Sequence, residues 1–313
     1  MHRLPPWVLV AGVLLVPFSA RAQDVTSSPS RSSLAGHRFI PREQVSNPFT
    51  SSFVASSSGV SSGSATGPTF DLDGNPVNLE DYKIVSYSQL FTGQWGIADF
   101  WAVRLRMLGT AYTGANASGA AGVGVNGVIR GSVGTSFSFK LADNLRLGAL
   151  VDVAWGPSIG ISILDAIRQS ISEGSVQTPV TNQYSTTVTP ALSLAWAVTR
   201  GLGAVVNAAY VNGVVEVNTT SSDLDMAVVQ GALDLDLREL GSIPLGLALD
   251  YSAGYSVENK RFRRYVLGFG IFYTGRPGLT LGLDLGYRRS PLGTKDVFTT
   301  SISGIFSLRY DFD

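Results

Sequence analysis

Isolated charged side chains, set among glycines and apolar residues, are the groups in this sequence best placed to do chemistry. Some lie on neighbouring segments with opposite sign: Asp250 is near Arg264, and Asp284 has candidate partners in Arg264, Arg288 and Arg309. Such charges could form a constriction that selects solutes. They could equally form a structural network of ion pairs inside a narrow interior, because buried charges need partners. The full set is Arg104, Arg106, Arg130, Arg146, Asp152, Asp234, Asp236, Asp250, Arg264, Asp284, Arg288 and Arg309.

Residue types that usually carry out catalysis are scarce. The chain has no cysteine and two histidines, of which only His37 lies beyond the first 22 residues. A serine nucleophile usually needs a histidine base, and zinc sites need histidine or cysteine ligands. Asp234 and Asp236 point the same way in an extended segment, but Arg238 follows them and no cleft is identifiable. We therefore expect no enzyme activity, no cofactor and no metal.

The composition favours a membrane β-barrel. Only 15% of the 313 residues are charged, against about 25% in typical soluble domains. The 23 basic and 23 acidic residues cancel, which argues against a strongly basic nucleic-acid-binding protein. Beyond residue 22 no apolar run reaches the roughly 18–20 residues that a membrane helix requires. A charge-poor chain without spanning helices can cross a bilayer only as a closed barrel.

The N-terminal part divides into two predicted segments. Residues 1–22 have a weakly basic start, an apolar stretch and a small-x-small site ending at Ala22, which predicts a cleaved secretory signal. Residues 26–67 contain 14 serines among 42 residues. Such a composition buries little apolar area, so we expect residues 23–45 to be a disordered periplasmic lead-in. The barrel is then expected over residues 46–313.

From about Tyr82 the sequence alternates with a period of two, the pattern of β-strands. In the segment 279–288, leucines and Tyr287 fall on one face, while Gly282, Asp284, Gly286 and Arg288 fall on the other. Alternation alone does not say which face points inward. The strands are about as long as a tilted membrane crossing requires, and aromatic residues gather near segment ends, as in interfacial girdles. We therefore expect the apolar face to contact lipid.

Short and long connections alternate along the chain. Short periplasmic turns and longer outer loops are typical of outer-membrane barrels, so the tight turns are expected to face the periplasm. Eleven strands are predicted at 82–95, 100–113, 128–140, 144–156, 185–198, 202–216, 224–238, 244–256, 263–273, 278–289 and 297–312. An even count needs one more strand before Tyr82, with 47–58 or 63–72 as candidates. The expected fold is all-β, an antiparallel meander barrel of about 12 strands, with 10 or 14 as alternatives.

Two hairpin sequences carry a family resemblance. Trp95-Gly96-Ile97-Ala98-Asp99-Phe100-Trp101 and Leu141-Ala142-Asp143-Asn144-Leu145 resemble turns in the MetA-pathway phenol-degradation barrels, which are distantly similar to long-chain fatty-acid transporters. The resemblance implies an outer-membrane transporter of a Gram-negative-type cell. The Asn-Pro-Ala hatch motif of fatty-acid transporters is absent, so a fatty-acid substrate is not supported. The end of the chain resembles the C-terminal strand that the barrel assembly machinery recognises. That signal usually ends on the aromatic residue itself, whereas here Asp313 follows Phe312.

The longest outer loop contains a short amphipathic pattern. Ile163, Leu164, Ile167 and Ile171 fall on one face of a helix predicted near residues 161–172. This helix could fold inward beside Trp155 and form an apolar entrance or constriction for hydrophobic solutes. It could also be a packed loop helix without a transport role.

Two functions of different classes remain. The first is a passive channel or transporter for small hydrophobic or amphipathic solutes in the outer membrane. The second is a non-conducting structural or docking barrel, in which the serine-rich N-terminal part binds an envelope protein partner. Both place the protein in outer-membrane lipid, delivered by the assembly machinery, and neither involves nucleic acid.

Overall fold

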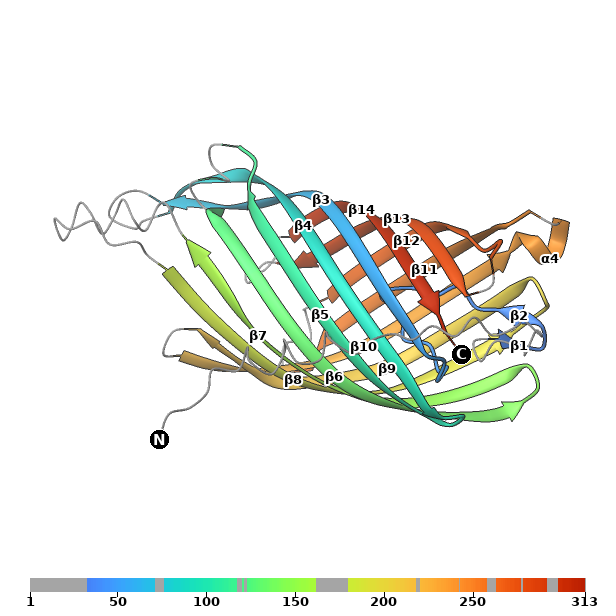
Figure 1. Ribbon diagram of the computed structural model, residues 1–313. Helices are drawn as coiled ribbons and strands as arrows, with labels where there is room; N and C mark the ends of the chain where they lie inside the picture. Colours follow the sequence, from blue (N-terminus) through green and yellow to red (C-terminus); the bar gives the residue numbers. More distant parts are fainter. Residues whose placement is uncertain are drawn as a thin grey trace, which may run out of the picture.

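Twelve antiparallel strands close into a barrel (Figure 1). The computed structural model describes residues 33–70, 76–116, 120, 123–161, 180–217, 220–241, 243–257, 263–276, 278–291 and 298–312. Each strand pairs with the next along the chain, and β14 pairs with β3 to close the sheet. The topology is therefore a simple meander, as the alternating pattern predicted.

The barrel strands are longer than most soluble strands. They are β3 (Phe53–Phe70), β4 (Pro76–Ala98), β5 (Trp101–Gly114), β6 (Val125–Ala142), β7 (Leu145–Ile161), β8 (Val180–Ala197), β9 (Leu202–Val217), β10 (Thr220–Asp236), β11 (Leu245–Ser256), β12 (Arg263–Tyr273), β13 (Leu279–Pro291) and β14 (Phe298–Asp311). Two short strands, β1 (Ser33–Leu34) and β2 (His37–Arg38), form a separate hairpin. A short helix, α4 (Leu237–Gly241), lies between β10 and β11.

The eleven predicted strands are confirmed, and the twelfth is β3. It begins at Phe53 and overlaps both candidate segments. Its serines do not show the apolar alternation of the other strands, but β4 and β14 would each have an unpaired edge without it. Backbone pairing with both neighbours satisfies those edges, and side chains add bonds such as Ser61 Oγ to Ser86 Oγ at 2.7 Å.

The apolar face of the barrel points outward. Leu283 and Leu285 are 66% and 63% exposed, whereas Asp234 and Asp250, on the opposite face, are each 2% exposed. A soluble barrel would show the reverse arrangement. The burial pattern therefore agrees with an outer surface that contacts lipid and an interior that holds the polar side chains.

Tight turns gather at the end of the barrel where β3 begins and β14 ends. Asp99 and Phe100 join β4 to β5, and Asp143 and Asn144 join β6 to β7. The helix α4 lies at this end (Figure 1). Among the described residues no helix is long and apolar enough to span a membrane. The helix predicted near residues 161–172 falls outside the described residues, apart from Ile161 at the end of β7.

The N-terminal residues 33–52, called here the lumen segment, lie inside the turn end of the barrel. Phe49 is fully buried, and Leu34, Phe39 and Val45 form a cluster with wall residues of β8, β9 and β10. A second cluster joins Ile40 to Ala248 and Phe272. The predicted disordered lead-in is therefore wrong for residues 33–45, while residues 23–32 lie outside the described part. The barrel wall starts at Phe53 rather than at residue 46.

Because Leu283 lies on the outward face of β13, we predict that Leu283→Arg destabilises the inserted barrel. An arginine on the lipid-facing surface near the middle of the bilayer costs about 2–4 kcal/mol. Urea unfolding of the protein in vesicles should show this loss, and Ser303→Arg, facing the lumen from the neighbouring strand β14, should show a much smaller one. Equal losses in the two variants would contradict the assigned orientation.

Candidate functional site

The central contact of the lumen is made by Arg42. Its Nε donates to Asp250 Oδ1 at 2.6 Å, and its terminal nitrogens also bond to Asp250 and Asp284. The Arg42 side chain is 6% exposed, and its guanidinium lies 5.3 Å from the centre of the Phe272 ring. Gly268 leaves room for the Arg42 guanidinium, because a Cβ at this position would lie 2.9 Å from an Arg42 nitrogen. One lumen-segment arginine thus joins carboxylates of β11 and β13.

A second anchor is the buried pair of His37 and Asp234. His37 Nε2 lies 2.6 Å from Asp234 Oδ1, and Nδ1 lies 3.0 Å from the carbonyl oxygen of Arg200. Burial lowers the pKa of His37, but the bond to Asp234, its charge, the Arg200 carbonyl and the charge of Asp236 together raise it above the ordinary value of 6.5. The protonated imidazole donates from both nitrogens, so this contact is strongest when His37 is charged.

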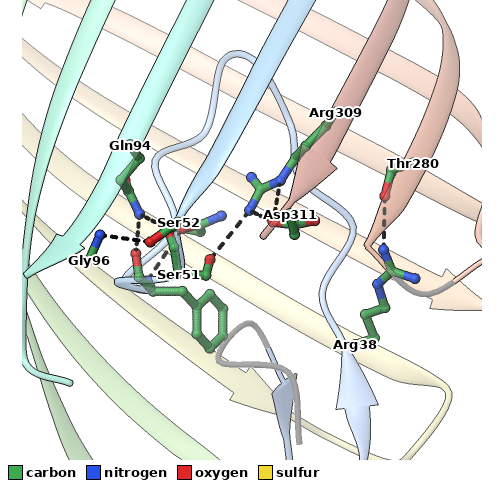
Figure 2. A network of polar contacts seen from close by, with 10 residues as sticks. Arg38, Ser51, Ser52, Gln94, Gly96, Thr280, Arg309 and Asp311 are labelled. Atoms are coloured by element: carbon green, nitrogen blue, oxygen red, sulfur yellow. Dashed lines mark hydrogen bonds and ion pairs between the residues drawn. The ribbon is translucent and has the colours of Figure 1, made fainter. Parts of the chain in front are cut away.

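Wall side chains also bind the backbone of the lumen segment. Gln94 donates to the carbonyl oxygens of Phe49 and Ser51, both at 2.9 Å, as Figure 2 shows. Ser193 Oγ donates to the Ser46 carbonyl at 2.9 Å. These bonds satisfy backbone groups that the segment cannot pair within a sheet, because it is mostly irregular.

The same close-up contains two arginines with different roles (Figure 2). Arg38, from the lumen segment, donates to Thr280 Oγ1 at 3.1 Å. Arg309, from β14, donates to Asp311 and reaches Ser51 Oγ at 3.5 Å. Its guanidinium also lies 3.6 Å from the centre of the Phe53 ring. The start of the barrel wall is therefore held against its last strand.

Sequence position alone gave the wrong partners for the lumen acids. The structure pairs both Asp250 and Asp284 with Arg42, and no ion pair joins either acid to Arg264, Arg288 or Arg309 within the described residues. Alternation along a strand assigns a side chain to a face. It does not show that a distant segment enters the lumen and offers a closer charge.

Most of the remaining predicted charged residues contact another wall residue or the lumen segment. Arg104 pairs with Asp152, and Arg130 Nη2 donates to Ser185 Oγ at 3.1 Å. Asp236 accepts from Thr274 Oγ1 at 3.3 Å. Arg146 lies with its guanidinium 5.5 Å from the Phe49 ring. Arg106, Arg264 and Arg288 lie at inward positions of β5, β12 and β13.

The predicted apolar entrance does not include Trp155. This side chain is 40% exposed on the outer face of β7, beside Gly131. Trp155 therefore cannot contribute to the apolar entrance that was one of the two alternatives, because the inward positions of β7 are the even-numbered ones, such as Asp152. Ile163, Leu164, Ile167 and Ile171 lie outside the described residues.

A cavity remains between the lumen segment and the wall. Its volume is about 100 Å³, and it is partly open to solvent. Apolar side chains and charged groups share its lining, which includes Val45, Phe53, Leu90, Phe272, Glu43 and Arg106. The mixture suits a small solute that has an apolar body and a polar group.

The residues missed at the sequence level were His37, Arg42 and Glu43. All three lie in the serine-rich part predicted to be disordered. A usable signal was present: charged residues grouped at 37–43 beside apolar Phe39 and Ile40, in a stretch that otherwise has few of either.

The titration of His37 predicts that the lumen segment loosens as the pH rises. Because its pKa is raised in the folded protein, its stabilising effect is complete below about 6.5 and is lost as pH rises through the raised value. A nitroxide on Gln44→Cys should gain mobility over this range in electron paramagnetic resonance spectra. His37→Gln should remove the pH dependence, and an unchanged profile in that variant would contradict the assignment.

Comparisons with known proteins place the fold. No family model matches the chain, and no curated protein matches it. The translocator domain of autotransporter NalP from Neisseria meningitidis aligns with a TM-score of 0.53 and 12% identity over 83% of this chain and 88% of that one. A Pseudomonas aeruginosa FadL homologue gives 0.49 and 11%, over 85% and 93% of the chains. The TodX deltaS2S3 mutant, a monoaromatic hydrocarbon channel, gives 0.44 and 13%, over 85% and 93%. At these identities the likeness concerns the fold, and the chain has the fold of an outer-membrane β-barrel.

Proposed function

We propose that this protein is a passive outer-membrane channel for small amphipathic solutes, closed at its turn end by the lumen segment. The observation that carries the proposal is the solvent-connected cavity beside that segment, lined by both apolar and charged side chains. A barrel filled only for stability would be expected to leave no such space, because protein interiors pack densely.

The outer surface supports the proposed location. Leucines and aromatic residues are exposed on successive strands, including Leu249, Phe269, Leu283 and Phe306. Exposure of so much apolar surface to water would be costly. The proposal therefore places this surface in outer-membrane lipid of a Gram-negative-type cell, reached through a cleaved signal over residues 1–22 and the barrel assembly machinery.

The lumen segment is held in a way that permits release. Its polar contacts with the wall, at His37, Arg42 and Ser46, are separate hydrogen bonds rather than a continuous backbone ladder. Breaking these bonds and separating the two apolar clusters would free a short stretch of chain without opening the barrel. Solute passage in this proposal requires the segment to move.

The absence of catalysis is part of the same proposal. The one histidine beyond residue 22 uses both ring nitrogens, one toward Asp234 and one toward the Arg200 carbonyl. It therefore has no free nitrogen with which to act as a base on a bound substrate while the segment stays in place.

A docking barrel is the second candidate. The observation that favours it is that the lumen segment occupies the turn end of the barrel. In that case the segment would be a permanent stabilising plug, and the residues before it would present a binding site for an envelope protein.

Locking the lumen segment distinguishes the two functions. The chain has no cysteine, so Ser46→Cys with Ser193→Cys introduces a single pair, placed where Ser193 Oγ contacts the Ser46 carbonyl. The uptake of radiolabelled phenylalanine, an amphipathic zwitterion, is measured in liposomes before and after oxidation. A channel should give uptake above empty liposomes when reduced, and at least a several-fold decrease when the disulfide forms.

The outcomes separate cleanly. Uptake no greater than that of empty liposomes, in both redox states and in the unsubstituted protein, would contradict the channel and favour the docking barrel. Ser193→Cys alone, which cannot form the bond within one chain, serves as the matched control for oxidation. Equal uptake by locked and reduced protein would show that the segment does not gate the lumen.

A further inference from the structure

Three arginines face the lumen beyond the lumen segment. Arg130 comes from β6, and Arg264 and Arg288 come from the adjacent strands β12 and β13. In the closed sheet, β6 lies six strands from β12, so Arg130 approaches from the opposite wall. Val266 is the register partner of Arg288, which makes Arg264 and Arg288 diagonal neighbours on one face.

These arginines lie close enough to repel one another. Arg264 interacts unfavourably with the charges of Arg288 and Arg130. Arg130 and Arg288 are also exposed to solvent within the barrel. A cluster of like charges destabilises a folded protein unless an opposite charge is supplied.

The nearby acidic side chains form ion pairs with other arginines. Asp250 and Asp284 bind Arg42, and Asp152 binds Arg104. Glu43 interacts with Arg288, but also with Arg106 and Arg42. Within the described residues no salt bridge reaches the three arginines.

The surrounding wall is rich in hydroxyl groups. Ser185 accepts a bond from Arg130, and Ser252 and Ser301 face inward as register partners of Val266 and Arg288. Hydroxyl and guanidinium groups both donate to anionic oxygens, and a guanidinium binds a carboxylate or sulfonate through two parallel bonds. The wall therefore offers donors that match an anionic head group.

We propose that Arg130, Arg264 and Arg288 form a binding site for the charged group of small organic anions. The site rests on the proposed channel function and narrows its solute class to amphipathic anions.

Binding to the full chain in detergent tests the site without any transport. The probes are benzenesulfonate and phenyltrimethylammonium, which share an aromatic ring and carry permanent charges of opposite sign. Isothermal titration calorimetry should detect benzenesulfonate binding and no phenyltrimethylammonium binding. The double variant Arg264→Gln with Arg288→Gln should weaken benzenesulfonate binding about tenfold or more, because a charge-assisted contact is lost at each position.

Arg289→Gln is the matched control. Arg289 follows Arg288 on β13 but lies on the outer face, with its guanidinium 4.1 Å from the centre of the Phe298 ring and a bond to the Tyr265 hydroxyl. This variant removes the same charge from the same strand and should leave benzenesulfonate binding unchanged. Equal weakening in both variants, or equal binding of the two probes, would overturn the site.

Liposome uptake of the same probes separates the site from the channel. Faster entry of benzenesulfonate than of phenyltrimethylammonium, with the difference lost in the double variant, supports both. Binding in detergent without uptake of either probe would retain the anion site and contradict the channel. Uptake of both probes at equal rates would retain the channel and contradict the site.

Discussion

A charged side chain that is buried inside a barrel needs a partner, because an unpaired charge is costly to remove from water. Asp234 and Asp250 lie on the inner wall and are each 2% exposed. Their partners, His37 and Arg42, come from a segment some 200 residues earlier in the chain. The requirement for charge pairing thus determines where the N-terminal residues lie, and with it the shape of the free space in the lumen.

The pairing also divides the lumen into two electrostatic zones. Around the lumen segment, acids of β10, β11 and β13 match its basic residues. Beyond it, Arg130, Arg264 and Arg288 face one another without a salt bridge among the described residues. One zone holds the segment in place, whereas the other has unmatched charge available to a solute. This asymmetry links the architecture to the proposed channel and its anion site.

The sequence predicted the wall far better than its contents. Alternation identified the strands and the outward face of residues such as Leu283, because each position depends on a local period of two. The lumen segment was missed because serine content was taken as a sign of disorder, although Phe39, Ile40 and Phe49 are buried against a wall built by distant strands. The partners of Asp250 depended on that docking, and no local pattern encodes it.

The most direct test of the central claim locates the lumen segment in intact membranes. Asn47 lines the cavity with Leu90 and Thr92 of β4 and is half-buried. Replacement of Asn47 by the photoreactive p-benzoylphenylalanine, followed by irradiation and mass spectrometry, should yield crosslinks within the chain, to β3 or β4. Adducts mainly to lipid or to other proteins, without internal crosslinks, would contradict the placement of residues 33–52 in the lumen.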